Sequence, residues 1–421
     1  MDEKGIDYSV TVRFRMKEII VKGTDFMKIL KRVGIAAGCA AIIIGAVWLC
    51  LGDKISLLYK SLDSFKDENL AHTFQHTPEI QPTVKIGKSE QAFQFLEEDN
   101  VDLTEGFRFA GDFYPTDQFM RDTKTSAMLV VKDDVIKYEE YFFGGDQNTV
   151  FSSNSMGKSF VSALMGIAIS EGAIDSVDDP LGKYIPEFVG TDLESIPIKA
   201  CLQMASGIDF DEDTDMSGFS LRTLMGMPAM KVIAKYGVQE EPFTYRRYLS
   251  INTEILGQVI KNATGQGLGT YMEEKLWKRI GSEHDAYWTL SNGTELANGG
   301  LSISLRDYAR FARLYLNEGI YNGEQVISKD WVRDSFDISA DYSKPGANDD
   351  GYNAIGYGYQ WWVPEGEQGE FMAIGVYGQF IYVNPANRVI IVKVDADPDF
   401  MSKNYELKHV EFFRAIADGL S

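Results

Sequence analysis

Two pairs of short apolar segments, one near each end of the chain, are separated by a long region in which apolar residues recur at helical spacing. Each pair flanks a polar turn and has the pattern of a β-hairpin. The predicted hairpins join 126–131 to 135–143 and 378–383 to 389–394. Between them, 155 to about 316 is expected to be mainly helical, and 406–420 is expected to form a closing helix.

Strands at both ends with helices between them predict an α+β fold. We expect one antiparallel sheet built from both ends of the domain, flanked by helices, with an inserted mainly helical region. A cleft is expected where the helical region meets the sheet. The aromatic run 357–362 is expected to pack mainly in the core, and lining of the cleft is the alternative.

An uncharged apolar run, 33–51, directly follows Lys31 and Arg32. Its length is enough to cross a bilayer core about 30 Å thick. A buried helix would rarely be apolar on every side, and no Ala-x-Ala-like site ends the run as in a cleaved signal peptide. Basic residues before the run place the N-terminus in the cytoplasm. The sequence therefore predicts a single-pass protein of the cell membrane with its larger body outside the cytoplasm.

Composition changes along the chain divide it into four expected parts. Residues 52–88 include an irregular stretch with Pro78 and Pro82, typical of a stalk. The expected parts are a cytoplasmic segment (1–32), a transmembrane anchor helix (33–51), a stalk or linker (52–88) and a folded domain (89–421).

Charge, cysteine content and histidine spacing argue against nucleic-acid binding, an internal disulfide and a metal site. The net charge of −21 argues against nucleic acid as the main partner. Cys201 is the one cysteine outside the apolar run 33–51, so no disulfide is expected within the folded domain. His72 and His76 are four residues apart but have no third ligand nearby. We therefore expect no metal site, and the serine chemistry considered below requires no metal and no organic cofactor.

The candidate chemistry centres on Ser155 and Lys158, which form the only Ser-x-x-Lys sequence in the chain. Ser153 and Asn154 are good N-cap residues, so Ser155 is expected in the first turn of a helix ending near Gly172. Residues three apart on a helix face the same side, which places the lysine beside the hydroxyl. This is the nucleophile arrangement of penicillin-recognising enzymes. A P-loop is excluded because it requires glycine at position 152.

A proton acceptor other than histidine is needed if Ser155 is the nucleophile. The chain has four histidines and no Gly-x-Ser-x-Gly elbow, and none of the histidines has an acidic partner in a recognisable order. Lysine or tyrosine is then the base. Tyr248 and Ser250 precede a predicted helix, where their side chains can face a cleft, although a half-buried structural tyrosine is the alternative.

From about Asp112 to Leu420 the chain resembles the serine hydrolases of the class C β-lactamase and penicillin-binding-protein type. The likeness is greatest to the branch with 6-aminohexanoate-dimer hydrolase and related esterases. The matching phrases occur in the family's order: 151–160 around Ser155, 178–181, 184–187, 202–208, Tyr248-Leu249-Ser250, and 299–311.

The resemblance implies a role for each matching residue. Ser155 would form an acyl-enzyme while Lys158 and Tyr248 share the proton transfer, and Ser250 would support them. The backbone N–H groups of Ser155 and of Val376 would bind the oxyanion. Gly375 would end the strand that lines the site.

One position departs from the family pattern. The strand that usually carries Lys-Thr-Gly or His-x-Gly reads Ala373-Ile374-Gly375 here. Without that cation, binding of a substrate carboxylate should weaken by about 1.5–3 kcal/mol. The resemblance thus favours hydrolysis of small-molecule esters or amides.

Two other functions stay open from the sequence. One is a D-Ala-D-Ala carboxypeptidase or β-lactamase acting on peptidoglycan-type substrates. The other is a catalytically inactive envelope protein that binds ligands. The natural substrate and the oligomeric state do not follow from the sequence.

Overall fold

The protein is described by a computed structural model over residues 63–347 and 354–420, and Ser64–Ser421 forms one compact unit. The predicted cytoplasmic segment 1–32 and the predicted anchor 33–51 lie outside the described residues. From residue 63 onward, none of the described helices combines the length and apolarity needed to cross a bilayer.

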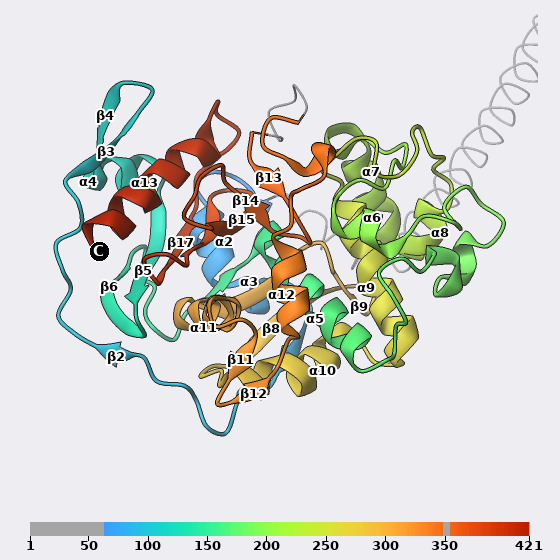
Figure 1. Cartoon of the computed structure of the whole chain (residues 1–421), viewed down its shortest axis with the longest axis horizontal. Helices are drawn as coiled ribbons and strands as arrows, with labels where there is room; N and C mark the ends of the chain where they lie inside the picture. Colours follow the sequence, from blue (N-terminus) through green and yellow to red (C-terminus); the bar gives the residue numbers. More distant parts are fainter. Residues whose placement is uncertain (1–62, 348–353, 421) are drawn as a thin grey trace, which may run out of the picture. The chain divides into compact units, whose positions relative to one another are not determined.

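An eight-stranded sheet is the main sheet of the described residues (Figure 1). The pairings are antiparallel, except that β2 runs parallel to β6. Strands from both ends of the domain meet where Leu129 of β5 pairs with Val392 of β17, which confirms the predicted α+β arrangement. The order is β13 (Gly356–Tyr357), β14 (Trp362–Val363), β15 (Phe371–Gly375), β16 (Gln379–Asn384), β17 (Val389–Asp395), β5 (Thr125–Lys132), β6 (Val135–Tyr141) and β2 (Leu96–Glu97).

The central strands of this sheet are buried on both faces. Leu129 of β5 belongs to the larger apolar core, whereas its neighbour Val130 belongs to a second core on the opposite face. A strand covered on both sides reads as a continuous apolar run, as in 126–131. Helix α11 (Leu305–Leu316) contributes to the first core, and helix α13 (Tyr405–Gly419) contributes to the second.

A second sheet of five strands corrects the expectation of a single sheet with only helices between 155 and 316. Strands β1 (Thr83–Ile86) and β7 (Val150–Ser152) have only four and three residues and pair with strands remote in sequence, so they give no clear periodic signal. In the part of the chain that the structure describes, this sheet contains β1 (Thr83–Ile86), β8 (Ala286–Ser291), β10 (Leu301–Ser304), β7 (Val150–Ser152) and, beside β8, β9 (Thr294–Glu295).

The folded unit begins at Ser64, not near Ser89, so the C-terminal part of the predicted 52–88 linker belongs to it. Strand β1 pairs with β8, and the side chains of Leu70 and Phe74 are buried. The sequence does not reveal these contacts. The stretch is polar and contains prolines, β1 has only four residues, and its partner strand lies about 200 residues further along the chain.

The remaining described elements include α-helices of four to fifteen residues, short 3₁₀ helices and two hairpins. The predicted helix after Ser155 is found as α5, and the predicted closing helix is found as α13. The helices are α2 (Leu70–Gln75), α3 (Thr77–Ile80), α4 (Thr116–Asp122), α5 (Lys158–Ser170), α6 (Ile198–Leu202), α7 (Glu212–Leu224), α8 (Ala229–Ile233), α9 (Ser250–Thr264), α10 (Leu268–Met272), α11, α12 (Lys329–Ser335) and α13; two hairpins are β3 (Gly106–Phe109) with β4 (Asp112–Pro115) and β11 (Ile320–Tyr321) with β12 (Glu324–Gln325).

Candidate active site

Ser155 lies in a 3₁₀ turn (η1, Asn154–Gly157) between strand β7 and helix α5. The α-helix begins only at Lys158, and Ser153 is the N-cap of the preceding 3₁₀ turn, although its side chain makes no capping hydrogen bond. Asn154 has a φ of 44°, which interrupts a regular helical start. Its amide Nδ2 donates to the carbonyl oxygen of Val376 at 3.0 Å. The turn with the serine is thereby tied to the end of β15.

Lys158 is buried, with 2% of its surface exposed, and its amine contacts three oxygen atoms. Nζ lies 2.7 Å from Ser155 Oγ, 3.1 Å from Ser250 Oγ and 2.7 Å from the carbonyl oxygen of Asn298. Burial lowers the pKa of Lys158 to about 8, because the charged form loses its hydration. A substantial neutral fraction is therefore present near pH 8, so the amine can accept a proton from the hydroxyl it contacts.

Two carboxylates, buried Glu254 and half-buried Glu212, oppose this shift. Glu254 and Glu212 each raise the pKa of Lys158 through their charge. Burial raises the pKa of Glu254 to about 7 and also raises that of Glu212, while Lys158 acts in the opposite direction on both. Glu254 accepts the N–H of Asn298 at 3.0 Å, and Glu212 accepts the N–H of Ser250 at 2.7 Å. Both therefore fix groups that contact the lysine.

Sequence reasoning missed both glutamates. Glu254 follows Ser250 by four residues on α9, which places it on the same helix face. That spacing is a signal available from the sequence once Ser250 is assigned to the site. Glu212 has no such signal, because it begins α7 and reaches Ser250 only through the tertiary fold.

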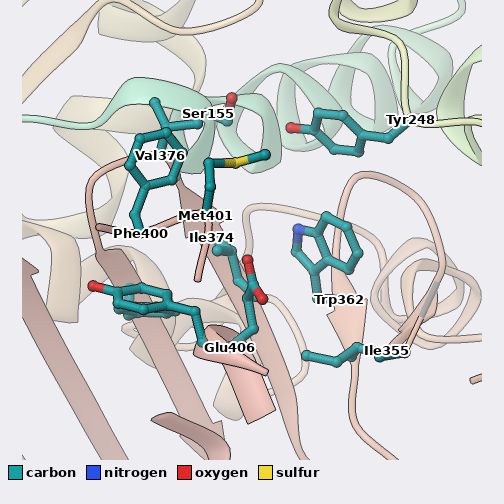
Figure 2. A pocket seen from close by; sticks show the side chains of 13 residues that line it. Ser155, Tyr248, Ile355, Trp362, Ile374, Val376, Phe400, Met401 and Glu406 are labelled. Atoms are coloured by element: carbon teal, nitrogen blue, oxygen red, sulfur yellow. The ribbon is translucent and has the colours of Figure 1, made fainter. Parts of the chain in front are cut away.

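Tyr248 lies two residues before α9 and is half-buried beside Lys158 and Ser155. The lysine Nζ is 5.2 Å from the centre of its ring. The ring stacks on Trp362 with centroids 5.5 Å apart, and it meets Tyr357 edge-on at 6.0 Å. Figure 2 shows the tyrosine hydroxyl directed toward Ser155. The structure thus brings the three predicted reactive side chains together.

Gly375 and Val376, predicted near the oxyanion, line the same pocket as Ser155. A Cβ atom on Gly375 would lie 2.5 Å from the carbonyl oxygen of Ser153 and 3.1 Å from the backbone nitrogen of Met156. Only glycine allows β15 to approach the nucleophile turn this closely. The predicted donors, the N–H groups of Ser155 and Val376, therefore belong to segments in direct contact.

The pocket over Ser155 is mainly apolar (Figure 2). Its ionisable side chains are Tyr248, Tyr405 and Glu406, and its described lining contains no lysine, arginine or histidine. Ala373, at the position of the family's cation, is buried in the core. Trp361 packs in the core, as expected for most of the 357–362 run, whereas Trp362 lines the pocket, which was the alternative. The apolar lining consists of Ala354, Ile355, Trp362, Ile374, Gly375, Val376, Phe380, Phe400 and Met401.

None of the described histidines is among the residues that line this pocket, although the His409 ring stacks behind the lining residue Phe380. His409 is buried in the second core region, where its Nε2 is 3.3 Å from Lys393 Nζ. His284 lies beside Asp307, with Nδ1 3.4 Å from the carboxylate. His72 and His76 stack on each other at 4.2 Å. Among the described groups, Lys158 and Tyr248 are accordingly the ones placed to exchange a proton with Ser155.

Comparisons with known proteins identify the family of this chain. The family model described as Beta-lactamase matches residues 116–399. The 6-aminohexanoate-dimer hydrolase of Paenarthrobacter ureafaciens is 29% identical over 303 residues, covering 67% of this chain and 75% of that protein.

Solved structures show the same fold. A Bacillus anthracis protein assigned as a 6-aminohexanoate-dimer hydrolase superimposes with a TM-score of 0.75 at 25% identity, covering 85% of this chain and 96% of that one. The D-alanine carboxypeptidase AmpC of Burkholderia cenocepacia superimposes with a TM-score of 0.53 at 16% identity, covering 71% of this chain and 95% of that one. The family match and these relatives support a serine hydrolase with the β-lactamase fold. The chain belongs to the beta-lactamase family.

Proposed function

We propose that the chain is a membrane-anchored serine hydrolase that cleaves ester or small amide bonds through an acyl-enzyme on Ser155. The observation that carries the proposal is the 2.7 Å contact between Lys158 Nζ and Ser155 Oγ in a pocket shared with Tyr248. The anchor would be 33–51, with the catalytic body outside the cytoplasm, as the apolar run and the preceding basic residues indicate.

In the proposed reaction, Ser155 Oγ attacks the substrate carbonyl and its proton passes to neutral Lys158. The Tyr248 hydroxyl, directed at Ser155, relays a proton to the leaving alcohol or amine. The backbone N–H groups of Ser155 and Val376 bind the oxyanion, an interaction worth roughly 3 kcal/mol per donor in the transition state. Water then attacks the acyl-enzyme by the same route and releases the acid.

Glu406 supports a preference for substrates that carry an amino group. It stands in the first turn of α13 and its carboxylate points into the apolar pocket (Figure 2). Burial raises its pKa, while a hydrogen bond with its own backbone N–H lowers it. An ammonium group at the end of an aliphatic chain would fit both the apolar wall and this carboxylate. The relative named 6-aminohexanoate-dimer hydrolase acts on a molecule of this kind.

The lining argues against a carboxylate-binding carboxypeptidase or β-lactamase. Such an enzyme needs a cation that binds the substrate carboxylate, and the described lining contains the acid Glu406 but no lysine, arginine or histidine. A non-catalytic binding protein is disfavoured because Lys158 and Ser155 are already in hydrogen-bond contact. Rapid turnover of nitrocefin would favour the first alternative. Ligand binding without labelling of Ser155 by a fluorophosphonate would favour the second.

The test is a panel of activated esters and small amides on the full chain in detergent. Ser155→Ala should abolish turnover and fluorophosphonate labelling, and Lys158→Ala should reduce kcat by at least about 10³-fold, because the serine loses its proton acceptor. Ser170→Ala, an exposed serine at the end of α5, is the matched control and should behave as wild type. Turnover that survives Ser155→Ala would disprove the proposal.

The amino-group preference has its own test. The wild type should hydrolyse the 4-nitrophenyl ester of 6-aminohexanoate with a higher kcat/KM than the ester of hexanoate. Glu406→Gln should lower the ratio of the two values about tenfold, as expected for loss of a charge-assisted contact. Glu411→Gln, on the same helix but paired with Arg414, is the control. An unchanged ratio in Glu406→Gln would exclude this role and leave the hydrolase proposal intact.

A further inference from the structure

The turn that follows β15 has an unusual backbone conformation next to the proposed oxyanion donor. Tyr377 has a φ of 64° and Gly378 a φ of 84°, so both adopt the left-handed region directly after Val376. Glycine enters this region readily, whereas a tyrosine does so only when its surroundings hold it there. Left-handed residues that carry side chains recur at functional sites, where tertiary contacts impose the strain.

Hydrogen bonds hold part of this turn. The carbonyl oxygen of Tyr377 accepts from the N–H of Asp397 at 3.2 Å and from Nε2 of Gln379 at 3.3 Å. The carbonyl oxygen of Val376 accepts from Asn154 at 3.0 Å. These bonds fix two carbonyl groups but leave the Tyr377 ring to be held by packing.

Three phenylalanines surround the Tyr377 ring. Phe65 stacks on it at 6.0 Å between centroids, Phe74 lies at 5.3 Å and Phe400 at 4.6 Å. Phe65 and Phe74 also meet each other edge-on at 6.3 Å. Phe400 lines the pocket over Ser155, but Phe65 and Phe74 do not belong to that lining.

Phe65 and Phe74 lie upstream of the β-lactamase match, which begins at residue 116, and about 300 residues before Tyr377. Phe74 belongs to α2 and is 3% exposed, in a buried cluster with Leu70 and Ala396. Gln75 of the same helix donates to the carbonyl oxygen of Phe142 at 3.2 Å, which attaches the helix to the end of β6. The segment is therefore a fixed support for the ring.

We propose that Phe65 and Phe74 are positioning residues that clamp Tyr377 and thereby hold the Val376 N–H in the direction needed to bind an oxyanion. The inference rests on the proposed function, because an oxyanion forms only if Ser155 attacks a carbonyl. The two rings act through Tyr377 and touch neither the substrate nor the reacting atoms. The N-terminal segment from Ser64 would thus complete the active site of a domain whose family match begins at residue 116.

Loss of the clamp should slow acylation more than it weakens substrate binding. An oxyanion donor acts on the transition state, and its removal typically costs 10²–10³-fold in kcat. A donor that is present but less well oriented should cost less. For Phe65→Ala in the full chain we expect kcat for an activated ester to fall about tenfold with KM changed less than twofold. Because Phe65 is 42% exposed, this variant should fold.

The matched pair Phe74→Ala and Phe107→Ala separates positioning from stability. Both residues are phenylalanines with 3% exposure, but Phe107 packs in the second core against Phe119 and Phe412. Both variants should lose similar thermal stability. At a temperature where circular dichroism shows both variants to be folded, only Phe74→Ala should have a reduced kcat. Phe74→Leu should have a kcat between those of Phe74→Ala and the wild type.

Two further variants test the ring itself. Tyr377→Phe keeps the ring and should retain the wild-type kcat. Tyr377→Gly accepts the left-handed conformation but removes the ring, and it should lose kcat as Phe65→Ala does. Affinity for a boronic acid transition-state analogue should fall by the same factor as kcat/KM in each impaired variant.

The outcomes distinguish this inference from the function on which it rests. If the wild type hydrolyses esters and the Phe65, Phe74 and Tyr377→Gly variants keep its kcat, the clamp is disproved and the hydrolase stands. If Phe107→Ala loses kcat as much as Phe74→Ala, the effect is general destabilisation and the clamp is again disproved. If the wild type neither turns over esters nor reacts at Ser155 with a fluorophosphonate, both proposals fail.

Discussion

Glu254 and Lys158 act on the same residue from opposite sides. The carboxylate accepts the N–H of Asn298 at 3.0 Å, and the amine donates to the carbonyl oxygen of Asn298 at 2.7 Å. The buried acid therefore holds a backbone group that orients the lysine, and its charge raises the lysine pKa at the same time. Position and basicity of the proposed proton acceptor are set by one contact network.

The pH dependence of ester hydrolysis should follow Lys158. Burial lowers its pKa from the usual 10.5 to about 8, and only the neutral amine accepts a proton. We therefore expect kcat/KM for a neutral ester to rise about tenfold per pH unit below the pKa and to level off above about pH 8. A flat profile between pH 6 and 9 would contradict the role of Lys158 as base.

Glu254→Gln should move that profile to lower pH. Gln keeps an oxygen acceptor for Asn298 but removes the negative charge that favours the ammonium form, so the pKa of Lys158 should fall further. The rising limb of kcat/KM should shift to lower pH by about one unit or less. Glu370→Gln provides a control, because this buried acid pairs with Arg414 and not with the lysine. A shift to higher pH would refute the electrostatic assignment.

Glu254 should also make stability depend on pH. Its pKa rises from 4.5 in the unfolded chain to about 7 in the folded protein, so the folded state binds more protons between these values. Stability should then fall as pH rises from about 4.5 to 7, by up to a few kcal/mol. Urea unfolding of wild type and Glu254→Gln at pH 5 and 7.5 measures this. The wild type should lose more stability over the interval than the variant.

Gly375→Ala tests the contact between β15 and the nucleophile turn. The new methyl group would lie 2.5 Å from the Ser153 carbonyl oxygen, so the turn with Ser155 must shift. A displacement of this kind typically costs about 10²-fold in rate, and we expect that loss in kcat. Gly218→Ala in α7 has open space around the new atom and should leave kcat unchanged.

Tyr248→Phe isolates the tyrosine hydroxyl. The phenyl ring keeps its stacking on Trp362 and its place over Lys158, so the lysine–serine contact should persist. If the hydroxyl relays a proton, kcat should fall by about 10²–10³-fold with little change in stability. Retention of wild-type kcat would assign the whole proton transfer to Lys158.

The sequence predicts the parts of this protein that depend on local pattern. Alternating and continuous apolar runs indicated both hairpins of the main sheet, and helical spacing indicated α5 and the closing helix. A motif with fixed spacing marks Ser155 and Lys158 as candidates, and a family likeness marks these two residues and Tyr248. These features need only neighbours along the chain, or a pattern already known from relatives, to be recognised.

Only the tertiary structure decided which residues distant in sequence lie next to the candidate site. Glu212 reaches Ser250, and Phe65 and Phe74 reach Tyr377, through folding that no spacing encodes. Strands β1 and β7 of the second sheet escaped prediction because they are short and pair with strands remote in sequence, and β1 also lies in a stretch that has the composition of a linker. Burial also lowers the pKa of Lys158, because the amine loses its hydration only when the folded domain surrounds it.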